Sequence, residues 1–268
     1  MNPETRRLWR TLVNDLGHIL GHHQALLFLG AVLARPLYPM LRREYGMVPG
    51  VYIHGARACG KSYLGEVAAC LFSPDERTRR VLCGSFHWKL FRSCLLAEPA
   101  GHPPLVEEWQ DGDAAHNKIT DLCMSMGLDP STTSPAGRIT FDTPLAIIGE
   151  YPSTHRPLAA RCLHFIPHRG IRPDRLRPVA NQGEIHLIHA DLVSRLAAWE
   201  GLAKAFIDAA DNKVAPHVGG NMGVMLRIAW GVAVTAHQLL DGQDAPGKEL
   251  RQWLNKNATL LCPACTLA

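Results

Sequence analysis

The residues best suited to chemistry follow the phosphate-binding pattern G-x-x-x-x-G-K-[ST], which reads Gly55-Ala56-Arg57-Ala58-Cys59-Gly60-Lys61-Ser62 in this chain. The glycines allow backbone amides to curl around phosphate oxygens, and a helix that begins near Lys61 adds the positive end of its dipole. We expect Lys61 to neutralise the β- and γ-phosphates and the Ser62 hydroxyl to bind Mg²⁺. The four residues between the glycines supply mainly backbone, with Cys59 as a spacer, and Tyr63 completes the expected nucleotide-binding segment.

A second candidate feature is a short apolar run that ends in two carboxylates, Leu105-Val106-Glu107-Glu108. Nucleotide hydrolysis needs carboxylates at a strand end, beside the metal and the attacking water. We expect Glu107 to hold the metal, directly or through water, and Glu108 to orient or deprotonate the water. Aspartate is usual at the first position, so Glu107 is a departure that can shift the ion or weaken hydrolysis. A solvated strand end is the alternative interpretation.

An arginine precedes another apolar run, because Arg161 is followed directly by Cys162-Leu163-His164-Phe165-Ile166. This position suggests an arginine finger, which reaches the γ-phosphate bound by a neighbouring subunit. The alternative is an arginine paired with an acid at the sheet edge. The run that ends at Gly149 is followed by Glu150, Ser153 and Thr154, and spacing alone does not choose between a role at the phosphate and a simple turn.

Strands and helices must position these residues, and the pattern predicts an α/β fold: a P-loop NTPase with a mainly parallel sheet flanked by helices. We expect an N-terminal helical segment at 1–45, a P-loop core at 46–183 and a helical C-terminal subdomain with a tail at 184–268. The expected core strands lie at 51–54, 81–83, 103–109, 143–149 and 162–166. Helices are expected at 62–71, 86–97 and 114–126, a loop at 127–137 and an exposed connection at 167–183.

Composition and the lengths of the apolar runs exclude disordered and membrane-spanning proteins. The 268 residues are 47% hydrophobic and 19% charged, which excludes a disordered chain, and the net charge of +4 permits a polyanionic partner without requiring one. No apolar run approaches the roughly 18 to 20 uncharged residues of a membrane span, and the N-terminus lacks the apolar stretch of a signal peptide. We therefore expect a cytoplasmic protein with no membrane contact.

Cysteines, histidines and a basic stretch offer weaker signals. The eight scattered cysteines suit free thiols, and the fourteen histidines form no metal motif, so core or surface positions are the better interpretation. Cys262 and Cys265 have the spacing of half a zinc site, but no second pair is evident, so a reduced thiol pair or a surface tail is the better interpretation. The basic stretch either follows a nucleic-acid backbone or is a solvated loop. Its members are His155, Arg156, His168, Arg169, Arg172, Arg175 and Arg177.

Taken together, residues 20–240 resemble the ATPase domain of AAA+ and superfamily 3 type helicases, as found in phage and plasmid primase-helicases. The P-loop is the highly specific part of this resemblance. Its other parts are Pro36-Leu37, Pro49-Gly50, Pro104 to Glu108, Leu145 to Glu150, Asn221 to Leu240 and Ala160-Arg161-Cys162, which is similar to the arginine-finger motif of clamp-loader ATPases.

The resemblance implies a homo-oligomeric ring, with a hexamer expected, in which ATP and Mg²⁺ bind between subunits and hydrolysis moves or remodels DNA, single-stranded DNA in particular. The sequence departs from the family pattern at Glu107. We also expect no primase domain or DNA-binding module before the ATPase. Two alternatives stay open. One is a P-loop kinase that passes the γ-phosphate to a small acceptor, and the other is a nucleotide-gated assembly or defence protein that unwinds nothing.

Overall fold

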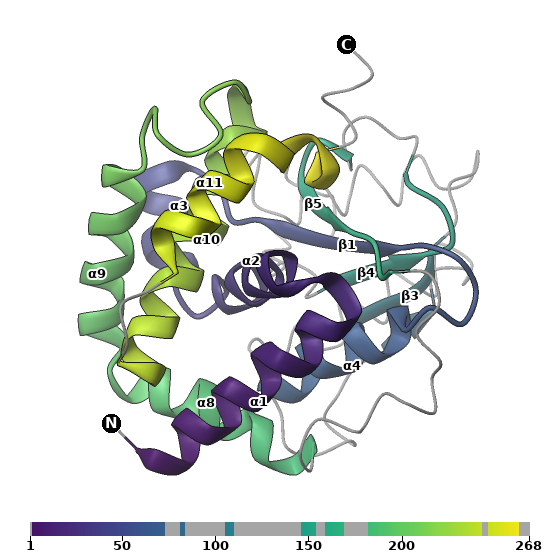
Figure 1. Cartoon of the computed structure of the whole chain (residues 1–268), viewed down its shortest axis with the longest axis horizontal. Coiled ribbons are helices and arrows are strands. Elements are labelled where there is room, and N and C mark those ends of the chain that lie inside the picture. The colour runs from purple at the N-terminus through teal and green to yellow at the C-terminus, as the bar shows by residue number, and fades with distance from the viewer. Residues whose placement is uncertain are drawn as a thin grey trace, which may run out of the picture.

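A five-stranded sheet lies at the centre of the fold (Figure 1). A computed structural model describes residues 2–72, 81–83, 105–109, 146–153, 159–168, 182–242 and 246–262. The strands are β1 (Gly50–His54), β2 (Val81–Cys83), β3 (Leu105–Trp109), β4 (Ala146–Gly149) and β5 (Cys162–Phe165), in the order β2-β3-β4-β1-β5. Every strand pair is parallel, which confirms the predicted α/β fold. The predicted elements at 86–97, 114–126 and 127–137 lie outside the described residues, as does most of 167–183.

The strand that leads into the P-loop is buried on both faces. Val51 and Ile53 point into the main hydrophobic core, whereas Tyr52 and His54 point to the opposite face and are also buried. Parallel strands covered on both faces lose the alternation of polar and apolar residues. This is why β1 appears in the sequence as a short β-prone run that ends in glycine.

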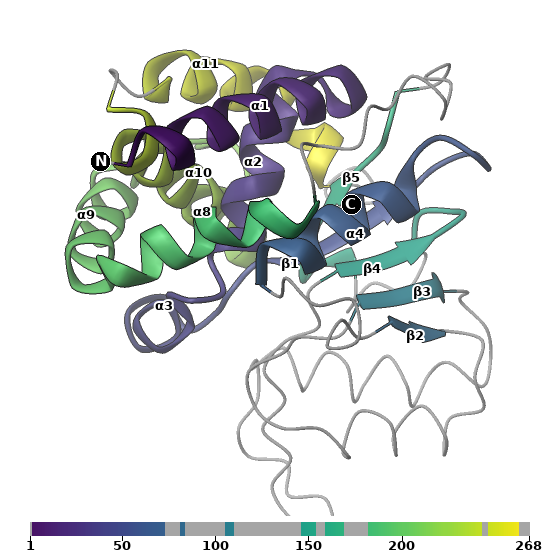
Figure 2. The same ribbon diagram turned by 90° about the horizontal axis from the view of Figure 1, so that it is seen from below.

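The helices of the described ranges lie on one face of the sheet and beside it (Figure 2). They are α1 (Pro3–Leu20), α2 (His22–Leu33), α3 (Tyr38–Tyr45), α4 (Lys61–Phe72), α8 (Gln182–Ser194), α9 (Leu196–Ala209), α10 (Gly220–Asp241) and α11 (Gly247–Asn257), with a short 3₁₀ helix at Ala258–Leu261. Helix α4 lies over the sheet and contacts β1, β3 and β4, α8 packs against α4 and α1, and α2 and α10 contact β5. The helices before and after the sheet therefore share one hydrophobic core with it.

Helices α1 and α10, far apart in the sequence, are joined by specific contacts. Arg10 in α1 donates from Nε to Oδ1 of Asp241 in α10 over 2.7 Å, and Trp9 Nε1 donates to Nδ1 of His237 over 3.1 Å. Helix α2 packs even more closely against α10. The predicted domain boundaries at 45 and 183 stay a prediction, but the segments on either side of them are packed together.

Helix α10 is long and apolar enough to cross a membrane, and 72% of its apolar window is buried inside the protein. Among the other described helices, α1 and α2 combine this length with this apolarity only when taken together, and they are bent by 117° where they meet. A central core helix has the same length and apolarity as a membrane span, and α10 lies among α1, α2, α9 and α11. Its burial therefore fits a core helix.

A glycine sets the separation of α2 and α10. A Cβ built on Gly30 would collide with the carbonyl oxygen of Ala229 and lie 2.9 Å from the Ala233 Cβ, whereas a Cβ on Gly201 in α9 would meet nothing within 4 Å. We expect Gly30→Ala to lower the free energy of unfolding by about 2 kcal/mol or more, because the helices must separate. Gly201→Ala should raise it by about 0.5–1 kcal/mol, because alanine favours an exposed helix interior.

Urea unfolding of the two variants checks this prediction, with each glycine change serving as the control for the other. Equal urea midpoints for Gly30→Ala and the wild type would show that α2 and α10 do not approach as closely as described.

Candidate functional site

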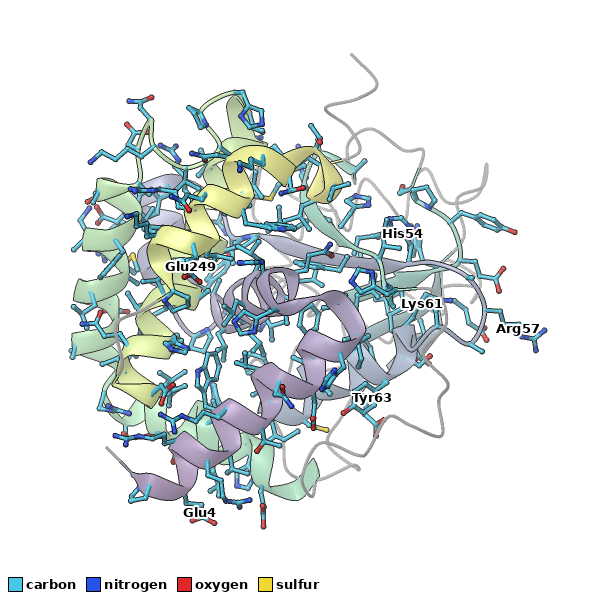
Figure 3. The ribbon with its side chains drawn as sticks, viewed as in Figure 1. Glu4, His54, Arg57, Lys61, Tyr63 and Glu249 are labelled. Atoms are coloured by element: carbon cyan, nitrogen blue, oxygen red, sulfur yellow. The ribbon has the colours of Figure 1, made fainter. Side chains whose placement is uncertain are left out.

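The predicted phosphate-binding loop lies between the end of β1 and the start of α4 (Figure 3). Ala58 has a φ of 60° and Gly60 a φ of 97°, so the backbone turns sharply twice within the loop. A left-handed non-glycine residue is strained, and such strain gathers at ligand clamps. The loop is followed directly by α4, whose first residue is Lys61, so the helix dipole points toward the loop.

The side chains of the loop differ in where they point. Lys61 Nζ donates to the carbonyl oxygens of Gly55 and Ala56 over 2.8 Å each, so its ammonium lies over the loop. Arg57 is exposed and points away from the fold (Figure 3). Cys59 is buried, with its Sγ 3.2 Å from the place of a Gly55 Cβ, which fits a spacer role. The loop thus presents its backbone and Lys61 to an incoming anion.

The two predicted magnesium ligands are in contact. The Ser62 hydroxyl donates a hydrogen bond to the Glu107 carboxylate, which joins the first turn of α4 to the middle of β3, where the strand continues to Trp109 beyond the two acids. Burial raises the pKa of Glu107 above its ordinary value, and the neighbouring charge of Glu108 raises it further, while the bond from Ser62 opposes both. A cation that binds beside Glu107 would therefore stabilise the charged form of this carboxylate.

The second acid of the pair lies at an irregularity in β3. Val106 pairs with Ile147 and Trp109 pairs with Gly149, so Glu107 and Glu108 together face a single residue of β4. Glu108 has a φ of 53° and is exposed, whereas Glu107 is half-buried. A bulge of this kind redirects a side chain. It turns Glu108 to solvent while Glu107 stays against Ser62.

The remaining predicted residues are spread over both ends of the sheet. Glu150 is exposed at the end of β4, on the same edge as the loop, and Ser153 is buried nearby. Thr154 lies outside the described residues, as does the basic stretch apart from the exposed His168. Tyr63 lies in the first turn of α4 (Figure 3).

Arg161 lies at the opposite end of the sheet from the loop. Its carbonyl oxygen accepts from the Gly50 backbone N–H over 3.1 Å, at the start of β1. The five residues of β1 then separate it from Gly55 by roughly 16 Å at about 3.3 Å per residue. Arg161 therefore cannot contact a phosphate held by the loop of its own chain.

A buried aromatic and histidine cluster beneath the loop was not predicted from the sequence. The rings of Tyr52, His54 and His164 lie 5.0–5.7 Å apart, across the pair formed by β1 and β5. The Tyr52 hydroxyl donates to the Tyr151 carbonyl oxygen over 3.0 Å. The period of two in β1, with Tyr52 and His54 on one face, was the available signal.

Both histidines of this cluster are neutral at pH 7. Burial lowers the pKa of His54 to about 4, assisted by the positive charge of Lys61, and burial lowers the pKa of His164 to about 3, assisted by His54. In the unfolded chain these two histidines take up protons near pH 6.5, whereas in the folded chain they do not. Their contribution to the free energy of unfolding is therefore fully present above that pH. It is lost as the pH falls from 6.5 toward 4.

When the pH falls from 7 to 5, we expect the buried neutral state of His54 alone to lower the free energy of unfolding by about 2 kcal/mol. Urea unfolding of His54→Asn at both pH values should show a smaller difference than the wild type. His217→Asn, which changes an exposed histidine, is the control and should keep the wild-type difference. An unchanged pH dependence in His54→Asn would contradict the buried neutral state.

The cysteine interpretation agrees with the described part of the chain. Cys59, Cys70, Cys162 and Cys262 are buried and form no disulfide with another described residue, as expected of reduced core thiols. Within the described ranges, no three His, Cys, Asp or Glu side chains gather as metal ligands. Cys265 lies outside these ranges, so a zinc role for the C-terminal pair stays untested.

Comparison with known proteins identifies the fold. No protein-family model matches the chain, and no curated protein matches it significantly. The solved structure of the SCCmec type IV Cch active helicase is similar, with a TM-score of 0.67 and 14% sequence identity over the whole of this chain. The chain spans about half of that protein, 52% of its length. At this identity the likeness shows a helicase-like fold and nothing finer.

Proposed function

We propose that this chain binds ATP with Mg²⁺ and hydrolyses it as an AAA+ or superfamily 3-like motor that acts on DNA. The observation that carries the proposal is the hydrogen bond from Ser62 to Glu107, because it brings the phosphate-binding loop and the two acids of β3 together. Neither motif alone makes a hydrolytic site. The helicase-like fold supports a motor, as a structural analogy.

The residues present suit a magnesium nucleotide. Ser62 and Glu107 offer the hard oxygen ligands that Mg²⁺ prefers, and two protein ligands are sufficient because phosphates and water complete its shell. The backbone amides of the loop and the Lys61 ammonium would hold the phosphates. When bound, the metal neutralises charge on the β- and γ-phosphates.

The exposed Glu108 is the residue proposed to orient and deprotonate the attacking water. The bulge turns it away from Glu107, so the two carboxylates have separate roles although they are adjacent. Glu107 stays beside Ser62, and Glu108 points to solvent at the sheet edge where the loop lies. Release of free phosphate is the expected outcome, and transfer to a small acceptor would instead indicate the kinase alternative.

Arg161 is proposed to act on the nucleotide of a neighbouring subunit, because it cannot reach its own loop. Such a site would need a second copy of the chain, as a ring provides. We expect Lys61→Ala and Arg161→Ala each to abolish most ATP turnover, and an equimolar mixture of the two variants to regain part of it. Random mixing leaves about one quarter of the interfaces with both residues intact.

The measurement is phosphate release by the mixture against each variant alone. A control mixture of Lys61→Ala with Lys61→Ala, Arg161→Ala should stay inactive, since it holds no intact loop. A 1:1 mixture that is no more active than its components would count against action between subunits.

The DNA part of the proposal is tested by ATP turnover with and without single-stranded DNA. Stimulation by single-stranded DNA is the expected result for a motor on that substrate. Turnover that DNA does not change would favour the nucleotide-gated assembly or defence protein.

A further inference from the structure

A groove of about 640 Å³ lies between helices α9, α10 and α11. These helices lie side by side in both ribbon views, on the other side of the molecule from the phosphate-binding loop (Figures 1 and 2). The groove is therefore separate from the proposed nucleotide site. Its volume lies within the range of 300–1,000 Å³ that is typical of small-ligand pockets. We call it the α9–α11 groove.

The floor of the α9–α11 groove is aromatic and apolar. Phe206 from α9 and Trp230 from α10 lie 6.0 Å apart between ring centroids, beside Val234. Trp230 is buried and fixed, because its Nε1 donates to the Gly247 carbonyl oxygen over 3.1 Å. Phe206 is half-buried and offers the accessible ring. The floor is thus rigid, and part of its aromatic surface is open to a ligand.

Three cations line the same groove: Lys213, Lys248 and Arg251. They come from the turn after α9 and from the first part of α11. Asn255 joins these two segments, since its Nδ2 donates to the Lys213 carbonyl oxygen over 3.1 Å and its Oδ1 accepts from the Ala215 N–H over 2.7 Å. The fold therefore holds the cations together at one site.

These charges lack a partner in the described part of the chain. None of the described residues that line the groove is acidic, and none of the three cations forms an ion pair with another described residue. Elsewhere the chain does pair its surface cations, as Lys204 does with Glu44 over 2.8 Å. A positive rim around an aromatic floor is complementary to an anion with a flat apolar body.

We propose that the α9–α11 groove binds single-stranded nucleic acid, with a base against Phe206 and backbone phosphates on the three cations. Aromatic platforms combined with basic grooves bind single strands without sequence preference. The choice of a nucleic acid over another aromatic anion rests on the proposed function, whereas the site itself rests on the groove.

The test is the affinity of the full chain for a short fluorescein-labelled oligothymidylate, measured by fluorescence anisotropy at several salt concentrations without ATP. The triple variant Lys213→Gln, Lys248→Gln, Arg251→Gln should bind more weakly, with the slope of log K against log salt reduced by about 2, at about 0.7 per phosphate contact. The matched control is Arg7→Gln, Arg43→Gln, Lys256→Gln, which removes three exposed charges that do not line the groove. It should keep the wild-type slope.

A second variant tests the base contact separately from charge. Phe206→Leu keeps an apolar side chain of similar size, and it should weaken binding about fivefold without changing the salt slope. Circular dichroism checks that each variant is folded.

Several outcomes would overturn the inference. They are no binding by the wild type, equal slopes for the triple variant and its control, or an unaffected Phe206→Leu. Polyglutamate that displaces the oligonucleotide at equal charge would also overturn it, in favour of an acidic peptide. ATP turnover without DNA should stay at the wild-type level in the triple variant. Failure at the groove is therefore distinguishable from failure of the proposed nucleotide site, which Lys61→Ala reports.

Discussion

Replacement of Lys61 by alanine is expected to lower ATP turnover by about 100-fold or more, because Lys61 is the residue proposed to neutralise the β- and γ-phosphates, whereas Arg57 of the same loop points away from the fold. Its ammonium already lies over the loop, on the carbonyl oxygens of Gly55 and Ala56. A phosphate that binds there exchanges two neutral partners for a charged one, which strengthens the hydrogen bonds. The measurement is steady-state phosphate release at saturating ATP and Mg²⁺.

The matched control is Arg57→Ala, which removes a cation from the same loop. Arg57 is exposed and points outward, so its loss should change turnover by only a few fold. The thermal midpoint of Lys61→Ala should stay close to that of the wild type. Turnover that survives in Lys61→Ala, or that falls equally in Arg57→Ala, would contradict the assigned role of Lys61.

Glu108→Gln is expected to lower the turnover number by roughly 100- to 1000-fold and to leave ATP affinity nearly unchanged, since general-base catalysis contributes at that level. Glutamine keeps the length and the hydrogen-bonding ability of the side chain but does not accept the proton of the attacking water. The left-handed backbone at Glu108 has to be adopted by either residue, so the bulge should persist. Single-turnover phosphate release together with a binding titration separates the two effects.

Two other carboxylates give this experiment its contrast. Glu107→Gln should weaken the magnesium-dependent binding of ATP as well as ATP turnover, because Glu107 is the acid that contacts Ser62. Glu108, which points to solvent, does not take over this contact. Glu4→Gln changes an exposed acid at the start of α1, away from the loop in Figure 3, and should have no effect. Equal losses of affinity in Glu107→Gln and Glu108→Gln would show that the bulge does not divide the two roles.

The local parts of the fold could be predicted from the sequence. The glycines and Lys61 mark the loop, and the β-prone run before Gly55 and the helical pattern after Ser62 place it between β1 and α4. Glu107 follows the apolar start of β3, and its contact with Ser62 agrees with its predicted position. These features depend on neighbours in the chain, which is where sequence patterns are informative.

The features that were missed depend on residues far apart in the chain. The bulge at Glu108 appears only when β3 pairs with β4, about 40 residues later, and a pairing register is not written in either strand alone. The close approach of Gly30 to Ala229 likewise needs α2 and α10 to meet. His54 and His164 lie apart in the sequence, and their shared burial follows from the pairing of β1 with β5.

Hydrogen exchange of the backbone amides at residues 55–62, with and without saturating ATP and Mg²⁺, tests the central claim most directly. If the loop holds the phosphates through its N–H groups, exchange in peptides from this segment should slow on addition of ATP, and Lys61→Ala should lose most of that protection. Unchanged exchange at 55–62 in the wild type, or protection that appears only elsewhere in the chain, would contradict the account.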